Sequence, residues 1–336
     1  MQTMVWQTAK AGAIARLTQQ AFQLGELAQG QVRIQVKAVG LNFADIFALT
    51  GLYSATPQGA FVPGLEFCGT VVESKCDAYA VGDKVMGVTR FGGYASVIDS
   101  QPEYLTALPE GWSYQQGAAY LVQTLTAYYA LTERGNIKPQ QRVLIHSAEG
   151  GVGLQAMKLV QAMGAIPFGT VSSQAKADFL KALGFEHVLV RENNFAQQLK
   201  QQNLTFDLVL DGVGGAVQKA SFNALNPMGR LIVFGAAEFT PGKNRPNYLS
   251  AIFKYLKRPK YDVMDMISDN KSVMAFNLIW LWEQVDYLSQ LIQEMQTIKI
   301  SPPHVGHEFD FNDAKVAIEC LRQGNNLGKV VLNVVD

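Results

Sequence analysis

The stretch VLIHSAEGGVGLQAMKLV, residues 143–160, joins a short apolar run to a helical pattern through a glycine-rich turn. Ala148, Gly150 and Gly153 take the three small positions of a G-x-G-x-x-G pattern. Small residues let the backbone approach a pyrophosphate, and the following helix N-terminus offers free N–H groups. A plain strand-to-helix turn is the alternative, but the flanking elements favour a dinucleotide site. The loop residues expected to line it are Ala148, Gly150, Gly151, Val152 and Gly153.

Strands and helices alternate on both sides of this loop. Short apolar runs fall near residues 166–171, 187–190, 206–212 and 229–236, and helical patterns of about ten residues separate them. This alternation predicts a parallel sheet with crossover helices. The expected fold class is therefore α/β, with a doubly wound sheet of the Rossmann type.

The first part of the chain has a different character. Residues 1 to about 120 contain short β-like runs bounded by Gly, Asp and Ser, which predict an irregular β domain or a partial barrel. The tail, residues 307–335, reads as strand, helix, turn and strand. A chain of 336 residues is long enough for two such domains.

Composition excludes several classes of function. The chain has 28 Lys and Arg against 28 Asp and Glu, without the basic stripe that nucleic acid requires. No run approaches about 20 apolar residues, so we expect no membrane span. The N-terminus shows no signal-peptide pattern. Cys68, Cys76 and Cys320 form no CxxC pair, so free thiols and a cytoplasmic location are expected.

The end of the second expected strand bears on the choice of cofactor. An NAD site usually has an acid there, whereas GTVSSQAK, residues 169–176, has none. Ser172, Ser173 and Lys176 offer hydroxyls and a cation, and Arg191 follows the next strand. This set favours the 2′-phosphate of NADP(H). The alternative for Lys176 is a solvated lysine at a helix start.

Motifs along nearly the whole chain resemble the medium-chain dehydrogenases/reductases, in their zinc-independent, zeta-crystallin-like quinone oxidoreductase branch. The similarity rests on the order and spacing of GLNFADIFALTGLY (40–53), PGLEFCGTVVE (63–73), VGDKVMG (81–87), GGYAS (92–96), TLTAYYAL (124–131), VLIHSAEGGVG (143–153), SSQAK (172–176), FDLVLDGVGG (206–215), GRLIVFGA (229–236) and NNLGKVVL (325–332). Residues 225–246 and 270–282 more loosely resemble the vesicle amine transport protein-like sub-branch.

The resemblance implies a GroES-like β domain, residues 1–124 completed by about 298–336, and a Rossmann domain, residues 125–297. It also implies a homodimer joined at Rossmann-sheet edges, with strand 229–236 as the contributor. Cofactor and substrate would lie between the domains. The remaining residues implied at the cofactor are Asn42, Gln123, Thr126, Phe234, Gly235, Ala236, Asn326 and Lys329. For Asn326 and Lys329, which we place near the cleft mouth, simple turn and strand roles remain the alternative.

The same resemblance raises the question of zinc. Relatives that use zinc hold it with Cys, a His-Glu pair and a further Cys, and zinc needs about three such ligands. Here Asn42 stands at the first cysteine position and Leu65 at the histidine, leaving Glu66. Neither Cys68 nor His146 completes a set, so we expect no metal.

Hydride transfer without a metal still needs a hydrogen-bond donor at the acceptor oxygen. Tyr53 and the amides of Asn42 and Gln123 are candidates, and Asp45 is expected to orient its neighbours. Tyr53 as a packed turn residue and Asn42 as a local turn former are the alternatives. The sequence thus favours an NADPH-dependent reductase of quinones or α,β-unsaturated carbonyls. The second hypothesis is an NADP(H)-binding regulatory protein with little turnover.

Overall fold

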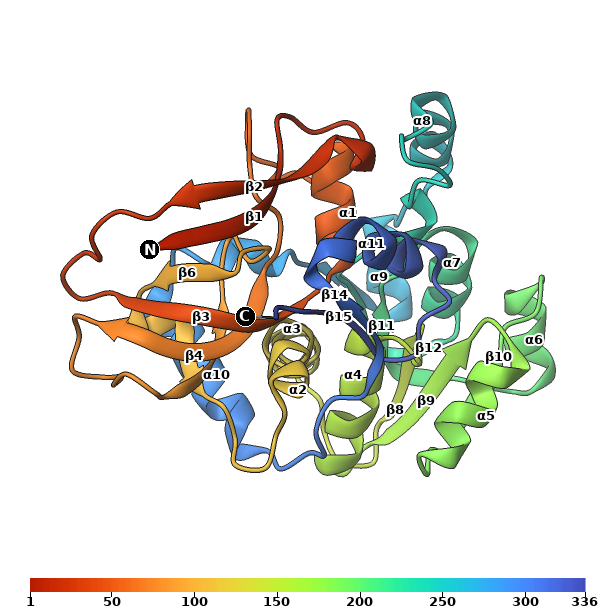
Figure 1. Cartoon of the computed structure of the whole chain (residues 1–336). Coiled ribbons are helices and arrows are strands. Elements are labelled where there is room, and N and C mark those ends of the chain that lie inside the picture. The colour runs from red at the N-terminus through yellow and green to blue at the C-terminus, as the bar shows by residue number, and fades with distance from the viewer. Residues whose placement is uncertain (336) are drawn as a thin grey trace.

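The computed structural model describes residues 1–335 and contains two large sheets with helices between and around them (Figure 1). The first sheet has the order β14 (Val305–Asp310), β15 (Lys329–Asn333), β3 (Val32–Gly40), β4 (Glu66–Ser74), β5 (Lys84–Val88), β7 (Leu105–Ala107). β6 (Val97–Ser100) pairs with β3, and β1 (Gln2–Thr8) forms a separate antiparallel pair with β2 (Leu17–Gln23). These strands account for the expected irregular β region.

The second sheet has six strands, and every pairing in it is parallel. Its order is β10 (Val188–Val190), β9 (Ile166–Val171), β8 (Arg142–His146), β11 (Phe206–Asp211), β12 (Leu225–Val233), β13 (Ser272–Ala275). Counted from β8, this is the 3-2-1-4-5-6 order of a dinucleotide-binding sheet. The α/β prediction is confirmed.

Helices cover both faces of this sheet because alternate strand residues point to opposite sides. Val143 and Ile145 of β8 share one apolar cluster with α3 (Leu121–Tyr129), α4 (Gly151–Ala162), α5 (Gln174–Ala182) and α10 (Val285–Thr297). Leu144 faces the other way, into a cluster with α6 (Phe195–Gln201) and α7 (Gly215–Asn223). The first cluster also includes residues of β3, β4 and β5, and it therefore joins the two sheets.

The C-terminal tail runs back to the first sheet, where β14 and β15 lie beside β3 (Figure 1). α1 (Phe43–Thr50) and α11 (Ala314–Gln323) contribute to the core of this part, and α2 (Tyr114–Ala118) packs against β3. On this arrangement we keep the limits 1–124 with 298–336, and 125–297, as the proposed domain division.

The expected edge strand at residues 229–236 is wrong. β12 pairs with β11 on one side and with β13 on the other, so its backbone groups are already used within the sheet. β13, and not β12, therefore forms this edge of the sheet. A dimer built on this edge would use Ser272–Ala275.

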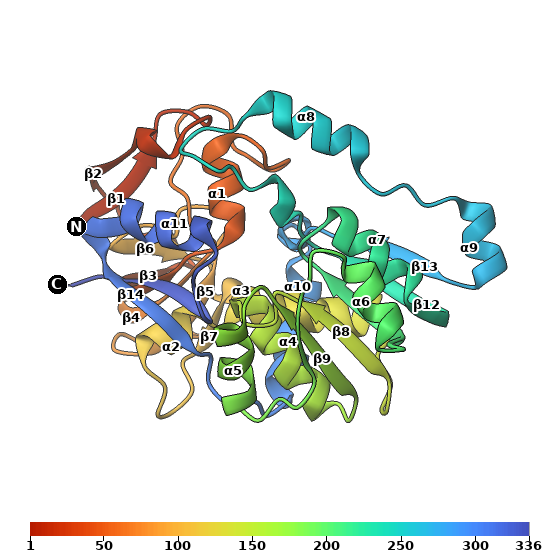
Figure 2. The same cartoon turned by 90° about the vertical axis from the view of Figure 1, so that its right-hand side faces the viewer.

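Two helices extend away from the sheets, α8 (Tyr248–Lys257) and α9 (Val263–Asp269) (Figure 2). Both expose apolar side chains, among them Leu249, Leu256 and Met264. Within residues 1–335 no helix is long and apolar enough to cross a membrane.

Candidate functional site

The glycine loop lies between β8 and α4, where the strand order of the parallel sheet reverses direction. This position, at the carboxyl ends of the strands, is where ligands bind in open α/β sheets. A side chain on Gly153 would meet Ala148 Cα at 2.7 Å and would also clash with the Ser147 carbonyl. A Cβ on Gly151 would clash with the side chain of Gln123 from α3. The small residues thus permit close packing on both sides of the loop.

The C-terminal tail closes over this loop. The Gly328 N–H donates to the Glu149 carbonyl at 2.7 Å, and residues 150 and 328 form an isolated parallel bridge. Asn326 is buried, and its Nδ2 donates to the Gly328 carbonyl at 2.9 Å. The structure therefore brings Asn326 beside the loop, although this side chain is engaged in holding the tail.

The expected phosphate-binding residues lie around the tip of β9. Ser172 is exposed and Ser173 half-buried. Lys176 donates to Glu149 Oε1 and to the Gly324 carbonyl, each at 2.7 Å, so it is not the freely solvated lysine of the alternative reading. Arg191 donates to Thr170 Oγ1 at 3.1 Å, and burial lowers the pKa of its guanidinium.

Lys329 does not lie at the cleft mouth, as the sequence had suggested. It is 1% exposed, and its Nζ forms an ion pair with Glu66 and donates to Asn42 Oδ1 at 2.9 Å. Asn42 Nδ2 in turn donates to Glu66 Oε1 at 3.1 Å, and Glu66 Oε2 accepts the Val122 N–H at 3.0 Å. Lys329 lies inside the protein because a buried ammonium must be paired, and the carboxylate that pairs with it, Glu66, is itself buried.

Asp45 is fully buried beside this network. It accepts hydrogen bonds from the N–H groups of Asn42 at 2.8 Å and Gly64 at 3.2 Å, and from the Tyr94 hydroxyl at 3.2 Å. Burial raises the pKa of its carboxyl group to about 6. These contacts suit a residue that fixes the start of α1.

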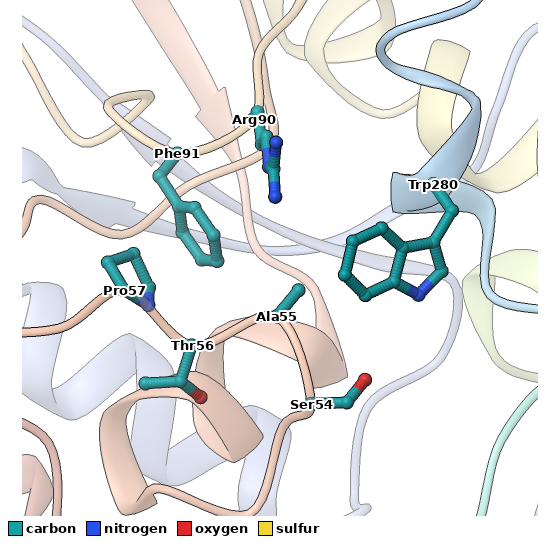
Figure 3. Close-up of a pocket in the computed structure, with 7 residues that line it drawn as sticks. All are labelled: Ser54, Ala55, Thr56, Pro57, Arg90, Phe91 and Trp280. Atoms are coloured by element: carbon teal, nitrogen blue, oxygen red, sulfur yellow. The ribbon is translucent and has the colours of Figure 1, made fainter.

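Tyr53 links the two halves of the molecule. Its hydroxyl donates to Asn277 Oδ1 at 2.8 Å, and burial raises its pKa to about 12. The residues after Tyr53 line an open pocket of about 470 Å³ (Figure 3). Phe91 and Trp280 stand on two sides of this pocket and Arg90 lies between them, 5.7 Å from the Trp280 ring centre (Figure 3).

The remaining expected residues lie on the adjoining elements. Thr126 of α3 is half-buried and donates to the Val122 carbonyl at 2.6 Å. Phe234, Gly235 and Ala236 follow β12 and are half-buried, with Gly235 packed closely against Gly212. They therefore lie at the carboxyl end of the parallel sheet, as the glycine loop does.

Comparison with known proteins supplies the family. Residues 28–128 match the alcohol dehydrogenase GroES-like domain, and residues 151–293 match the zinc-binding dehydrogenase domain. The chain is 30% identical to the human synaptic vesicle membrane protein VAT-1 homolog over 312 residues, 90% of this chain and 79% of the relative. The chain belongs to the medium-chain dehydrogenase/reductase superfamily.

Other members of this superfamily agree in fold. The zebrafish VAT-1 homolog is 30% identical over 316 residues, and the chain spans 64% of its length. The Thermus thermophilus quinone oxidoreductase, solved with NADPH, has a TM-score of 0.80 and 28% identity over 98% of this chain and 99% of that one. The CurK enoyl reductase has a TM-score of 0.80 and 27% identity over 99% of both. The GroES-like and Rossmann expectations are thus confirmed.

The superfamily includes zinc enzymes, but the residues present here do not fit the metal. Lys329 already places a positive charge against Glu66 and Asn42. Cys68 is fully buried, and burial raises the pKa of its thiol. Within residues 1–335 no group of three or more His, Cys, Asp or Glu is arranged to hold a metal ion. No step of the chemistry is therefore assigned to zinc.

Sequence reasoning missed three functional candidates. Glu149 is the only acid within the glycine loop, and that oddity was a usable signal. Asn277 accepts the hydrogen bond of Tyr53 and Trp280 lines the pocket, but both lie about 220 positions beyond Tyr53 in the sequence, and no local pattern marks them.

Proposed function

We propose that the chain is a zinc-independent oxidoreductase that uses NADP(H) to reduce quinones or α,β-unsaturated carbonyl compounds between its two domains. The observation that carries the proposal is the glycine loop at the reversal point of the parallel sheet, closed by the C-terminal tail. Two similar structures, a quinone oxidoreductase solved with NADPH and an enoyl reductase, support this reaction class.

The nicotinamide would supply the hydride. The protein would bind the pyrophosphate at residues 148–153, with the N-terminus of α4 directed at it. Lys176, Arg191 and the two serines after β9 are the proposed contacts of the adenosine end. Gln123, Thr126 and the backbone of residues 234–236 are the proposed contacts of the nicotinamide end.

We place the acceptor in the pocket beside Tyr53. Phe91 and Trp280 offer flat apolar surfaces (Figure 3). Arg90 pairs through Nη1 with Glu283 Oε1 at 3.0 Å, and its other N–H groups are the proposed donors to an oxygen atom of the acceptor. The Tyr53 hydroxyl is the proposed donor to the acceptor oxygen. In this arrangement it would exchange its bond to Asn277 for one to the substrate, and a donated hydrogen bond stabilises developing negative charge.

The second candidate is an NADP(H)-binding regulatory protein with little turnover, which we keep because the chain is similar to synaptic vesicle membrane protein VAT-1 homologs, whose name describes no reductase. Oxidation of NADPH, followed by absorbance with several quinones and enones, separates the two proposals. Turnover supports the reductase. Measurable NADPH binding without turnover of any acceptor supports the regulatory protein.

The cofactor assignment has its own test. Replacement of Lys176 by alanine should weaken the binding of NADPH much more than the binding of NADH, because the two cofactors differ only in the 2′-phosphate. Equal weakening of both would contradict the proposed role of Lys176. A homodimer and a cytoplasmic location complete the proposal, and sedimentation of the purified chain tests the former.

A further inference from the structure

Glu149 is an acid within a loop of small residues, and its side chain turns into the protein. The side chain is 8% exposed, and Oε1 accepts the hydrogen bond from Lys176 Nζ at 2.7 Å. Oε2 is buried and accepts no hydrogen bond from any residue in the described range 1–335. A buried carboxylate oxygen without a donor is costly, so Oε2 is suited to accept a hydrogen bond from a ligand hydroxyl.

Both cations expected to bind a 2′-phosphate interact with this carboxylate. The side chain of Lys176 is only 14% exposed, and two of its three N–H groups donate hydrogen bonds, to Glu149 and to the Gly324 carbonyl. Arg191 feels the charge of Glu149 as well as that of Asp211, and both raise the pKa of its guanidinium against the effect of burial. The positive charge at the adenosine end is therefore partly neutralised within the protein.

We propose that Glu149 is a specificity-determining residue that accepts the ribose 2′-hydroxyl of NAD(H) and offsets the preference for NADP(H) that Lys176 and Arg191 would give. The proposal rests on the proposed dinucleotide site. The acid that usually follows the second strand is missing here, and Glu149, which lies in the glycine loop, has the role of that acid. A 2′-phosphate must displace Glu149 from Lys176 and then lie near a carboxylate of like charge.

Titration calorimetry of the whole chain with NADP⁺ and NAD⁺ tests this, with 2′,5′-ADP and 5′-AMP as probes of the adenosine half alone. Glu149→Gln keeps the shape of the side chain and removes its charge. We expect the ratio of the two dissociation constants to move at least about tenfold in favour of NADP⁺. The affinity of the variant for 2′,5′-ADP should likewise rise relative to its affinity for 5′-AMP.

Two further variants isolate the cause. Glu192→Gln removes the same charge from an exposed residue next to Arg191, and it should leave the ratio unchanged. Glu149→Gln combined with Lys176→Met should lose the gain, because the phosphate then lacks the freed ammonium. If the glutamine variant does not fold, Glu149→Ala places a small residue at this position of the loop and serves in its place.

The two proposals fail in different ways. If both nucleotides bind wild type and variant with an unchanged ratio, the role of Glu149 is overturned and the cofactor site stands. If neither nucleotide binds the folded wild type, the proposed function falls, and this inference falls with it.

Discussion

Lys329 and Glu66 form an ion pair buried from solvent, although 263 residues separate them in the chain. Asn42 completes the cluster through bonds to both side chains. The pair joins β15 of the tail to β4, and it places a protein cation where the resemblance puts the metal of zinc-using relatives. The tail is thus part of the site as well as of the sheet.

Replacement of Lys329 by methionine should destabilise the fold. It leaves Glu66 charged and buried without its partner, and breaking such a pair costs about 3–5 kcal/mol. Urea unfolding measures the change. The double variant Lys329→Met/Glu66→Gln removes both charges and should recover much of the loss. A single variant as stable as the wild type would contradict the buried pair.

The stability contributed by Asp45 should depend on pH in a defined direction. Its carboxyl pKa rises from 3.8 to about 6 in the folded chain, because burial favours the neutral form. Between these values the unfolded chain has lost the proton that the folded chain retains, so this group stabilises the fold less as pH rises. The effect should reach a few kcal/mol, since one pKa unit corresponds to about 1.4 kcal/mol.

Asp45→Asn supplies the comparison, because asparagine does not titrate. Urea unfolding at several pH values should show the advantage of wild type over variant shrinking from about pH 4 to about pH 6. An advantage that grows over this range would mean that the folded chain favours the charged carboxylate.

Tyr53 and Asn277 permit a test of the proposed donor. Tyr53→Phe should lower kcat/KM for a quinone by up to about tenfold, the effect of one hydrogen bond. Asn277→Ala removes the competing acceptor and should leave kcat at or above the wild-type value. If both variants lose activity equally, the bond between the two halves of the molecule matters, and donation by Tyr53 does not.

Trp280 should influence the binding of flat acceptors. The substitution Trp280→Ala removes the indole ring that forms one wall of the pocket (Figure 3). We expect KM for an aromatic quinone to rise roughly three- to tenfold with little change in kcat, because ring stacking is lost before and during the reaction alike. A small aliphatic enone is the control and should show a smaller change. An equal change for both acceptors would place the quinone elsewhere.

Much of the fold could be predicted because its signals are local. The spacing of Ala148, Gly150 and Gly153 between an apolar run and a helical pattern predicted the turn between β8 and α4, and the alternation after it predicted the parallel sheet. The edge strand could not be predicted in this way. β13 is only four residues long, and nothing in β12 indicates that another strand pairs with it.

For the candidate site, the sequence proposes residues but does not indicate which other residues they contact. The sequence proposes Asn42 as a hydrogen-bond donor and Asp45 as a residue that orients its neighbours, and the structure places both in buried hydrogen-bond networks. Their partners could not be inferred, since Lys329 reaches Asn42 across 287 positions of sequence. The hydrogen bond between Lys176 and Glu149 could not be inferred for the same reason, because it depends on how β9 lies beside β8.

The most direct test of the central claim is the transfer of deuterium from NADPH labelled at the nicotinamide C4 to an enone, measured by mass spectrometry. Purified chain dialysed against a chelator should be used, with each C4 position labelled in turn. The account predicts that one of the two labels appears at carbon in the reduced product without added metal. Bound NADPH with no label in any product, or transfer only after zinc is added, would contradict it.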